Sequence, residues 1–187
     1  MNLVFAREAK TGLSVVCEYA ETMSSSVNTS LLTDMYELTM VDAALQSGTW
    51  NRGAIFELFG RRLPAARRFG VMAGNARIIE ALERFEFSSE EIDYLSREKI
   101  VSDDCLDYLK SYRFQGNIRG YTEGECYFES SPLIQVEGTF AECVLLETLL
   151  LSILNHDCAV ASAASRMTIA AHGRPCVDMG CLLYTSD

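Results

Sequence analysis

The chain has 187 residues, 49% hydrophobic and 22% charged, with a formal net charge of -10 at pH 7. This composition is typical of a globular protein with a substantial core, and the acidic balance excludes a surface-wide nucleic-acid role, because phosphate backbones require clustered Lys and Arg. The seven cysteines include no Cys-x-x-Cys pair, which excludes a zinc site of closely spaced ligands and favours reduced thiols in a cytoplasmic protein.

The first segment, residues 1–26, has weak periodicity and ends in a serine run. Met23 comes just before that run and is a candidate translation start, so we expect residues 1–22 to be an upstream extension or a loose tail. Arg7 and Lys10 are not followed by a continuous apolar stretch, which argues against a secretory signal.

Residues 31–40 carry the most informative local pattern in the chain. Thr33 or Asp34 is placed to cap a helix, since a side-chain oxygen accepts hydrogen bonds from the free amides of the first turn. We expect this helix to run to about Gln46, before a Ser-Gly pair that suits a helix C-terminus. Tyr36 lies on this amphipathic helix between acidic residues, which is more than packing requires and makes the segment a candidate binding element.

The middle of the chain predicts short strands and short helices. Ser88 and Glu91 have the spacing of a capping box and begin the second of three helices. The later strands are expected to form a small antiparallel or mixed β unit. In chain order we expect strands over 53–59 and 68–72, helices over 75–85, from 89 onward and over 103–112, and strands over 117–122, 125–128 and 133–137.

Residues 140–155 predict a buried helix, because leucine and isoleucine side chains cover most of its circumference. Glu147, Thr148 and Ser152 interrupt its apolar character. No apolar run therefore reaches the roughly 20 residues that a membrane-spanning helix needs, and we expect no membrane partner.

A second helix, rich in alanine and serine, is expected over residues 159–171. In this interpretation His156 lies at a helix end and His172 is a cap. Residues 176–179 then predict a short buried strand, followed by Gly180. A strand entering after two helices is typical of the first unit of an α/β layer or barrel, where strand ends carry the site.

Taken together, these segments resemble the nicotinate phosphoribosyltransferase family, especially its bacterial members. The ordered match covers about residues 30–180, and nine pieces in the right order form a specific signal. The matching pieces are Leu31-Leu-Thr-Asp-Met-Tyr-Glu-Leu-Thr-Met40, Ala54-Ile-Phe-Glu-Leu-Phe59 with Arg62-Leu63-Pro64, Leu106-Asp107-Tyr108-Leu109, Phe114-Gln-Gly116, Glu123-Gly124-Glu125, Pro132-Leu133-Ile134-Gln135-Val136-Glu137-Gly138, Glu147-Thr148-Leu149-Leu150-Leu151, Ala164-Ser165-Arg166-Met167 and Val177-Asp178-Met179-Gly180.

The resemblance implies an α/β fold, with an α+β N-terminal domain over 27–139. Residues 140–180 would then be the first helices and strand of an irregular α/β barrel of the type II phosphoribosyltransferase kind. The implied activity joins nicotinate to phosphoribosyl pyrophosphate, releases pyrophosphate and forms nicotinate mononucleotide, with Mg²⁺ and coupled ATP hydrolysis, in NAD salvage. The implied protein is a cytoplasmic homodimer that binds neither nucleic acid nor membrane.

The resemblance also implies roles for residues at the first helix. Tyr36 would stack on the pyridine ring and reach into the site from the neighbouring subunit of the dimer, while Thr33 and Asp34 stand beside it and orient the site. The alternatives are that Tyr36 is a core tyrosine of an amphipathic helix and that Asp34 is only an N-cap.

Three more residues are implied near the C-terminal end of the match. Arg166 is a partner for an anion or carboxylate, and Met179 with Gly180 stands at a strand end that faces the ring. A structural alternative for Arg166 is an ion pair with Glu142 or Glu147.

After Gly180 the sequence departs from the family. Residues 181–187 equal one reading frame of a transposon-end sequencing adapter, so we interpret them as a non-native tail and expect no transferase activity from these 187 residues alone. Quinolinate and nicotinamide phosphoribosyltransferases, which would take a different pyridine substrate, remain alternative functions. A non-catalytic α/β interaction module is a third alternative.

Overall fold

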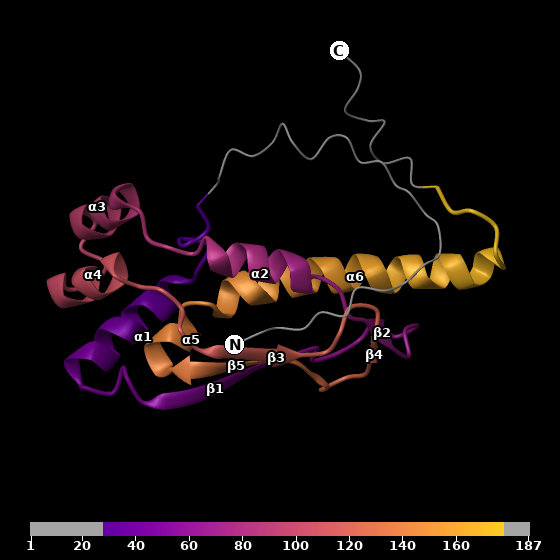
Figure 1. The fold of residues 1–187 in the computed structure, drawn as a ribbon, viewed down its shortest axis with the longest axis horizontal. Coiled ribbons are helices and arrows are strands. Elements are labelled where there is room, and N and C mark those ends of the chain that lie inside the picture. The colour runs from indigo at the N-terminus through magenta and orange to yellow at the C-terminus, as the bar shows by residue number, and fades with distance from the viewer. Residues whose placement is uncertain (1–27, 178–187) are drawn as a thin grey trace, which may run out of the picture.

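A computed structural model describes residues 28–177. Short helices and short strands come first along the chain, and one long helix comes last (Figure 1). The elements are α1 Met35–Gln46, β1 Gly53–Phe59, β2 Gly70–Val71, α2 Asn75–Glu83, α3 Ser89–Arg97, α4 Asp103–Lys110, β3 Asn117–Gly120, β4 Cys126–Tyr127, β5 Pro132–Thr139, α5 Phe140–Val144 and α6 Glu147–Ala171.

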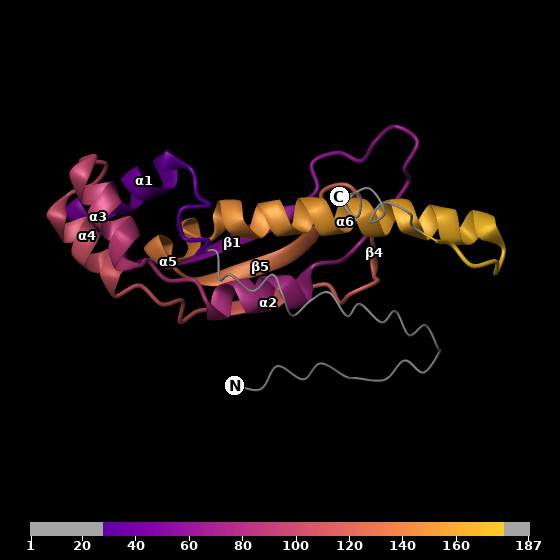
Figure 2. The same cartoon turned by 90° about the horizontal axis from the view of Figure 1, so that it is seen from above.

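Two antiparallel sheets organise the molecule. The larger has the order β1-β5-β3, with Phe56 opposite Val136 in its central register, and the smaller pairs β2 with β4. Helices α5 and α6 lie over the larger sheet, while α1, α3 and α4 gather at one end (Figures 1 and 2). The last turns of α6 extend past the rest of the molecule in both views.

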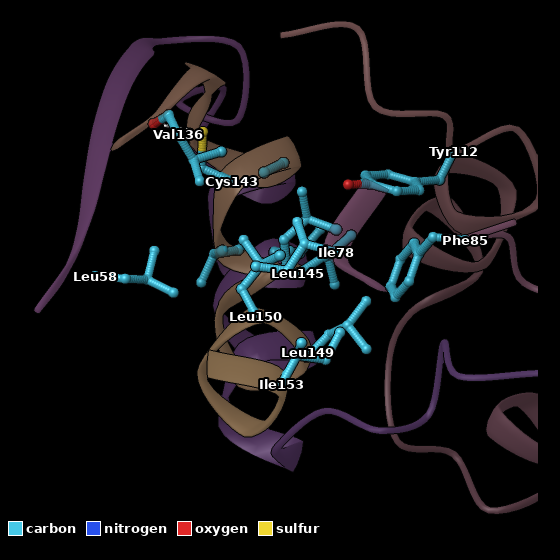
Figure 3. Packing of buried hydrophobic residues seen from close by; sticks show 14 of the residues in the cluster. Leu58, Ile78, Phe85, Tyr112, Val136, Cys143, Leu145, Leu149, Leu150 and Ile153 are labelled. Carbon is cyan, nitrogen blue, oxygen red and sulfur yellow. Dashed lines mark hydrogen bonds between the residues drawn. The ribbon is translucent and has the colours of Figure 1, made fainter. Parts of the chain in front are cut away.

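The core lies between the larger sheet and the helices (Figure 3). Leu145 and Leu150 have no exposed surface, and they lie between Leu58 and Val136 on the sheet side and Phe85 on the other. Burying a leucine of this kind contributes about 1.5–3 kcal/mol. The core draws on residues before and after position 139 alike, and the division at 139/140 stays a prediction.

The predicted break between the two C-terminal helices is misplaced. Helix α6 runs unbroken through residues 155–159, where the sequence has neither glycine nor proline, so His156 lies within a helix and not at its end. The break comes earlier, after α5. There the Tyr112 hydroxyl donates to the Glu142 carbonyl oxygen at 2.9 Å. The Leu146 amide, which would bond that oxygen in a continuous α-helix, donates to the Cys143 carbonyl oxygen at 3.2 Å. His172 does end α6, in a left-handed conformation with φ 49°.

Strands β3 and β4 follow each other in sequence but belong to different sheets. The turn that connects them is bound to the start of α2: the Glu123 carboxylate accepts hydrogen bonds from the backbone amides of Gly74 and Asn75 at 2.9 and 2.7 Å. These two amides open α2, where unpaired N–H groups attract a carboxylate. The expected single β unit is therefore divided by the contact of this turn with α2.

The strand expected over 176–179 is not seen in the part that the structure describes. Cys176 and Val177 lie outside any strand, and Val177 is 76% exposed because nothing described packs against it. The remainder of that stretch lies outside the described residues, as do residues 1–26, predicted to be a tail, and residues 181–187, predicted to be non-native.

One helical stretch, Phe140–Ala171, is long and apolar enough to cross a membrane by length and composition. The stretch passes on average hydropathy although polar residues interrupt its apolar run, so the expectation that the chain has no membrane partner stays a prediction. Half of the apolar window is buried inside the molecule, as in the core helix of a globular protein.

We predict that Gly116→Ala lowers the free energy of unfolding by about 2 kcal/mol or more, because an added Cβ would lie 2.1 Å from the Glu137 carbonyl oxygen, and backbone cannot move aside cheaply. Gly53→Ala is the control, since its Cβ meets nothing within 4 Å. Urea unfolding of both variants gives the comparison; equal midpoints would contradict the prediction.

Candidate functional site

The start of α1 is organised around one carboxylate. Asp34 is the residue before the helix, and its backbone N–H donates to Glu37 Oε2 at 3.3 Å. The Thr33 hydroxyl donates to the same oxygen. Thr33 and Asp34, predicted as neighbours of the site, are thus both tied to Glu37, in the manner of one half of a capping box.

Glu37 is completely buried. Its second oxygen, Oε1, accepts a 2.7 Å hydrogen bond from the hydroxyl of Thr148 on α6. A buried carboxylate is tolerated only when donors satisfy it, and here three donors do so from two parts of the chain. The spacing from Asp34 to Glu37 signals a capping box, but nothing in the sequence indicates the bond to a residue 111 positions away.

Tyr36 points outward beside this buried group. Its side chain is 47% exposed, which shows that it is not a core tyrosine. Its hydroxyl lies 3.3 Å from Oε1 of Glu147 and donates to it. Burial, then the nearby carboxylates of Glu147, Glu37 and Asp34, raise the pKa of the Tyr36 phenol. The ring is therefore carried by a neutral phenol that is anchored at its hydroxyl and open on the side that faces solvent.

Apolar side chains extend the exposed surface around Tyr36. Tyr36 and Met40 are four residues apart on α1 and therefore lie on one side of it, and Leu32 lies in the turn just before the helix. Their exposed fractions are 47%, 39% and 47%, and that of Met35 is 66%. We call these four residues the α1 apolar stripe.

Arg166 lies in the second half of α6 and is held by backbone and aromatic groups. Its guanidinium donates to the carbonyl oxygens of Ser162 and Phe69, and it lies 4.5 Å from the centre of the Phe69 ring. Neither Glu142 nor Glu147 pairs with it, because the first accepts from Thr139 and Gln115 and the second from Tyr36. The ion-pair alternative is therefore wrong.

The structure does not bring Tyr36 and Arg166 together within one chain. Tyr36 is tied to Glu147 at the start of α6, and Arg166 follows 19 residues later, which is about 28 Å along a helix with 1.5 Å rise per residue. The other two predicted site residues, Met179 and Gly180, lie outside the described residues. The candidate site in hand is therefore the start of α1 with its contacts on α6.

The described residues offer no ready-made metal site. Between residues 28 and 177, no group of three His, Cys, Asp or Glu side chains is placed to hold an ion. Cys105, Cys143 and Cys158 are buried free thiols, and burial raises the pKa of Cys105 to about 12 and of Cys143 to about 11. Such thiols are inert packing groups and not ligands or nucleophiles.

Comparison with known proteins gives a consistent result. Residues 31–155 match the family model described as the nicotinate phosphoribosyltransferase N-terminal domain. The chain is 55% identical over 150 residues to the nicotinate phosphoribosyltransferase pncB1 of Mycobacterium tuberculosis, covering 80% of this chain and 33% of that protein. It is 38% identical to a nicotinate phosphoribosyltransferase of Bacillus subtilis, covering 74% of this chain and 28% of that protein.

A solved structure is similar as well. The crystal structure of human nicotinic acid phosphoribosyltransferase superposes with a TM-score of 0.71 at 28% identity, covering 76% of this chain and 29% of that one. The chain thus spans about a third of the length of the curated relatives it matches.

We predict that Glu147→Gln lowers the pKa of Tyr36 toward its ordinary value of 10, because the substitution removes a negative charge that disfavours the phenolate. A raised pKa in the folded state means that Tyr36 stabilises the fold fully below pH 10 and that this contribution is lost as the pH rises through the folded value. NMR titration of ring-labelled tyrosine measures the shift. Glu80→Gln on α2, whose carboxylate pairs with Arg84, is the control and should leave Tyr36 unchanged; a Tyr36 pKa that stays in place in Glu147→Gln would contradict the prediction.

Proposed function

The chain belongs to the nicotinate phosphoribosyltransferase family, and from this we propose the function of the whole protein. The whole protein transfers the phosphoribosyl group of phosphoribosyl pyrophosphate to nicotinate, releases pyrophosphate and couples the step to ATP hydrolysis. It works in the cytoplasm as an enzyme of NAD salvage. The observation that carries the proposal is the half-exposed, anchored Tyr36 inside the segment that matches the family model.

Tyr36 supplies what the reaction needs from a base-binding group. The ribosyl carbon becomes cation-like as pyrophosphate departs, so the pyridine nitrogen must be held in line with that carbon. An aromatic face anchored through its hydroxyl restricts a flat ring without a directional bond. The carboxylates that raise the pKa of Tyr36, with Glu147 the nearest at the hydroxyl, also favour the positive charge that develops on the pyridine ring.

Arg166 provides a positive group for an anion. Its guanidinium is fixed by two carbonyl oxygens and the Phe69 ring, and among the described residues no carboxylate pairs with it. A fixed guanidinium of this kind suits a carboxylate or a phosphate. Because it lies far from Tyr36 along α6, the two residues serve one substrate molecule only if they come from different subunits. We therefore propose a homodimer, with the α1 apolar stripe at the subunit contact.

The cosubstrates and the metal belong to the same proposal. Phosphoribosyl pyrophosphate and ATP bring their own phosphate groups, which are the usual principal ligands of Mg²⁺. The described residues do not form a cage for the ion, so we assign none of them to Mg²⁺ and derive no step through it. The names of the relatives favour nicotinate over quinolinate or nicotinamide as the pyridine substrate.

We predict that Tyr36→Ala, in the protein extended to the length of its relatives, raises the KM for nicotinate about tenfold, because loss of an aromatic stacking partner costs about 1–3 kcal/mol. Tyr36→Phe keeps the ring face and should stay within a few-fold of the parent. Tyr94→Ala is the matched control and should leave the KM for nicotinate unchanged. Tyr94 is similarly exposed, at 43%, but it lies on α3 and takes no part in the bonds between α1 and α6.

The same assay tests the substrate. Nicotinate mononucleotide formation is measured with nicotinate, nicotinamide or quinolinate, with and without ATP. Preference for another pyridine would contradict the proposed substrate, and an unchanged KM in Tyr36→Ala would contradict the stacking role. The 187-residue chain alone should give no product.

We predict that Tyr36→Ala and Arg166→Ala complement each other in a mixed dimer. If each site takes Tyr36 from one subunit and Arg166 from the other, a mixed dimer has one intact site and one doubly altered site, and recovers about half the activity of the parent dimer. Co-expression with two different affinity tags isolates it. If both residues act within one subunit, every site carries one defect and activity is not recovered.

A further inference from the structure

Helices α1 and α6 are joined at one point by two adjacent side-chain pairs. Tyr36 bonds Glu147, and the next residue, Glu37, bonds the next residue of α6, Thr148. The two pairs differ greatly in surroundings. Tyr36 is about half exposed and its bond is 3.3 Å long, whereas Glu37 is completely buried and its bond to Thr148 is 2.7 Å.

We propose that Glu37 is a positioning residue for nicotinate binding, and that its bond to Thr148 sets the direction in which Tyr36 presents its ring. This inference rests on the proposed function, because it assumes that Tyr36 meets the substrate. Glu37 itself is sealed from substrate and acts only through its neighbour on the helix.

The geometry of a helix makes the coupling direct. Consecutive residues project about 100° apart around the axis, so a helix whose Glu37 is fixed inward has its Tyr36 fixed in rotation. The same carboxylate holds the Thr33 hydroxyl and the Asp34 amide, which fixes where the helix begins. Glu37 therefore controls both the rotation and the start of the helix that carries Tyr36.

The exposed Tyr36–Glu147 bond is too weak for this task alone. Water competes for both groups, and a hydrogen bond in that setting contributes little net stability. A buried carboxylate is different, because leaving one of its oxygens without a donor carries the full cost of desolvation. The bond between the buried Glu37 carboxylate and Thr148 thus holds the helix in place, and the exposed Tyr36–Glu147 bond follows it.

The test is Thr148→Val in the protein extended to the length of its relatives. Valine has nearly the same shape and leaves Glu37 Oε1 without its donor. We expect the KM for nicotinate to rise about fivefold to tenfold, the equivalent of one lost hydrogen bond, with kcat and the KM for phosphoribosyl pyrophosphate within twofold of the parent. Thr148→Ser restores the hydroxyl and should return the KM for nicotinate to within twofold.

Thr168→Val is the matched control. It is the same substitution on the same helix, but the Thr168 hydroxyl bonds only the Ala164 carbonyl oxygen of α6 itself, at 3.0 Å. It should leave both KM values unchanged. Thermal unfolding of each variant reports any loss of folded protein, which lowers the apparent kcat but does not change a KM.

Two results would overturn the inference. In one, Thr148→Val lowers the melting temperature or kcat while the KM for nicotinate stays unchanged, which assigns Thr148 a structural role only. In the other, both KM values rise together, which indicates general disruption of the site. If Tyr36→Ala raises the KM for nicotinate and Thr148→Val does not, the stacking role stands and the positioning role of Glu37 is wrong. If Tyr36→Ala has no effect, the stacking role fails first.

Discussion

Leucine side chains at the α5–α6 junction and in the first turn of α6 have almost no exposed surface, and the fold depends on covering them. Leu145, Leu149 and Leu150 are each at most 1% exposed. One side is closed by the sheet through residues such as Leu58 and Val136, and the other by α2 and the aromatic residues that follow it (Figure 3). No single neighbouring element is wide enough to do this, so segments from along the whole described chain converge on one helix.

Helix α1 approaches the same helix end with a charged group. Glu37 is buried against α6 and survives there because Thr33, Asp34 and Thr148 donate to it. A satisfied buried carboxylate is more demanding than an apolar contact, since it accepts only one arrangement of its donors. That demand supports our proposal that the outer side of α1 presents Tyr36 in a defined direction.

The two candidate binding groups are separated by the length of α6. Its first turns lie in the core and anchor Tyr36, whereas its later turns are largely exposed, with Met167 and Ile169 at 63% and 64%. Exposed apolar side chains that gather on one surface are typical of a region that contacts another molecule or another part of the protein. The same separation places Arg166 out of reach of Tyr36 in one chain, and this is the physical reason for our proposal that two subunits share the site.

The sequence alone determined the local elements closely. Strand β1 has the predicted bounds, α1 has the predicted N-cap and end, and the capping box at Ser88 begins α3 as expected. The resemblance to the family also came from the sequence, because short motifs in a fixed order can be recognised without a structure. These features depend on neighbours within about four positions, which a linear pattern records.

Only the tertiary structure decided the rest. The break between α5 and α6 depends on the Tyr112 hydroxyl, 30 positions from Glu142. The separation of β3 from β4 depends on Glu123 bonding the start of α2. The importance of Glu37 depends on Thr148, 111 positions away. Contacts across such separations are fixed by which surfaces the core brings together, and a linear sequence does not record that.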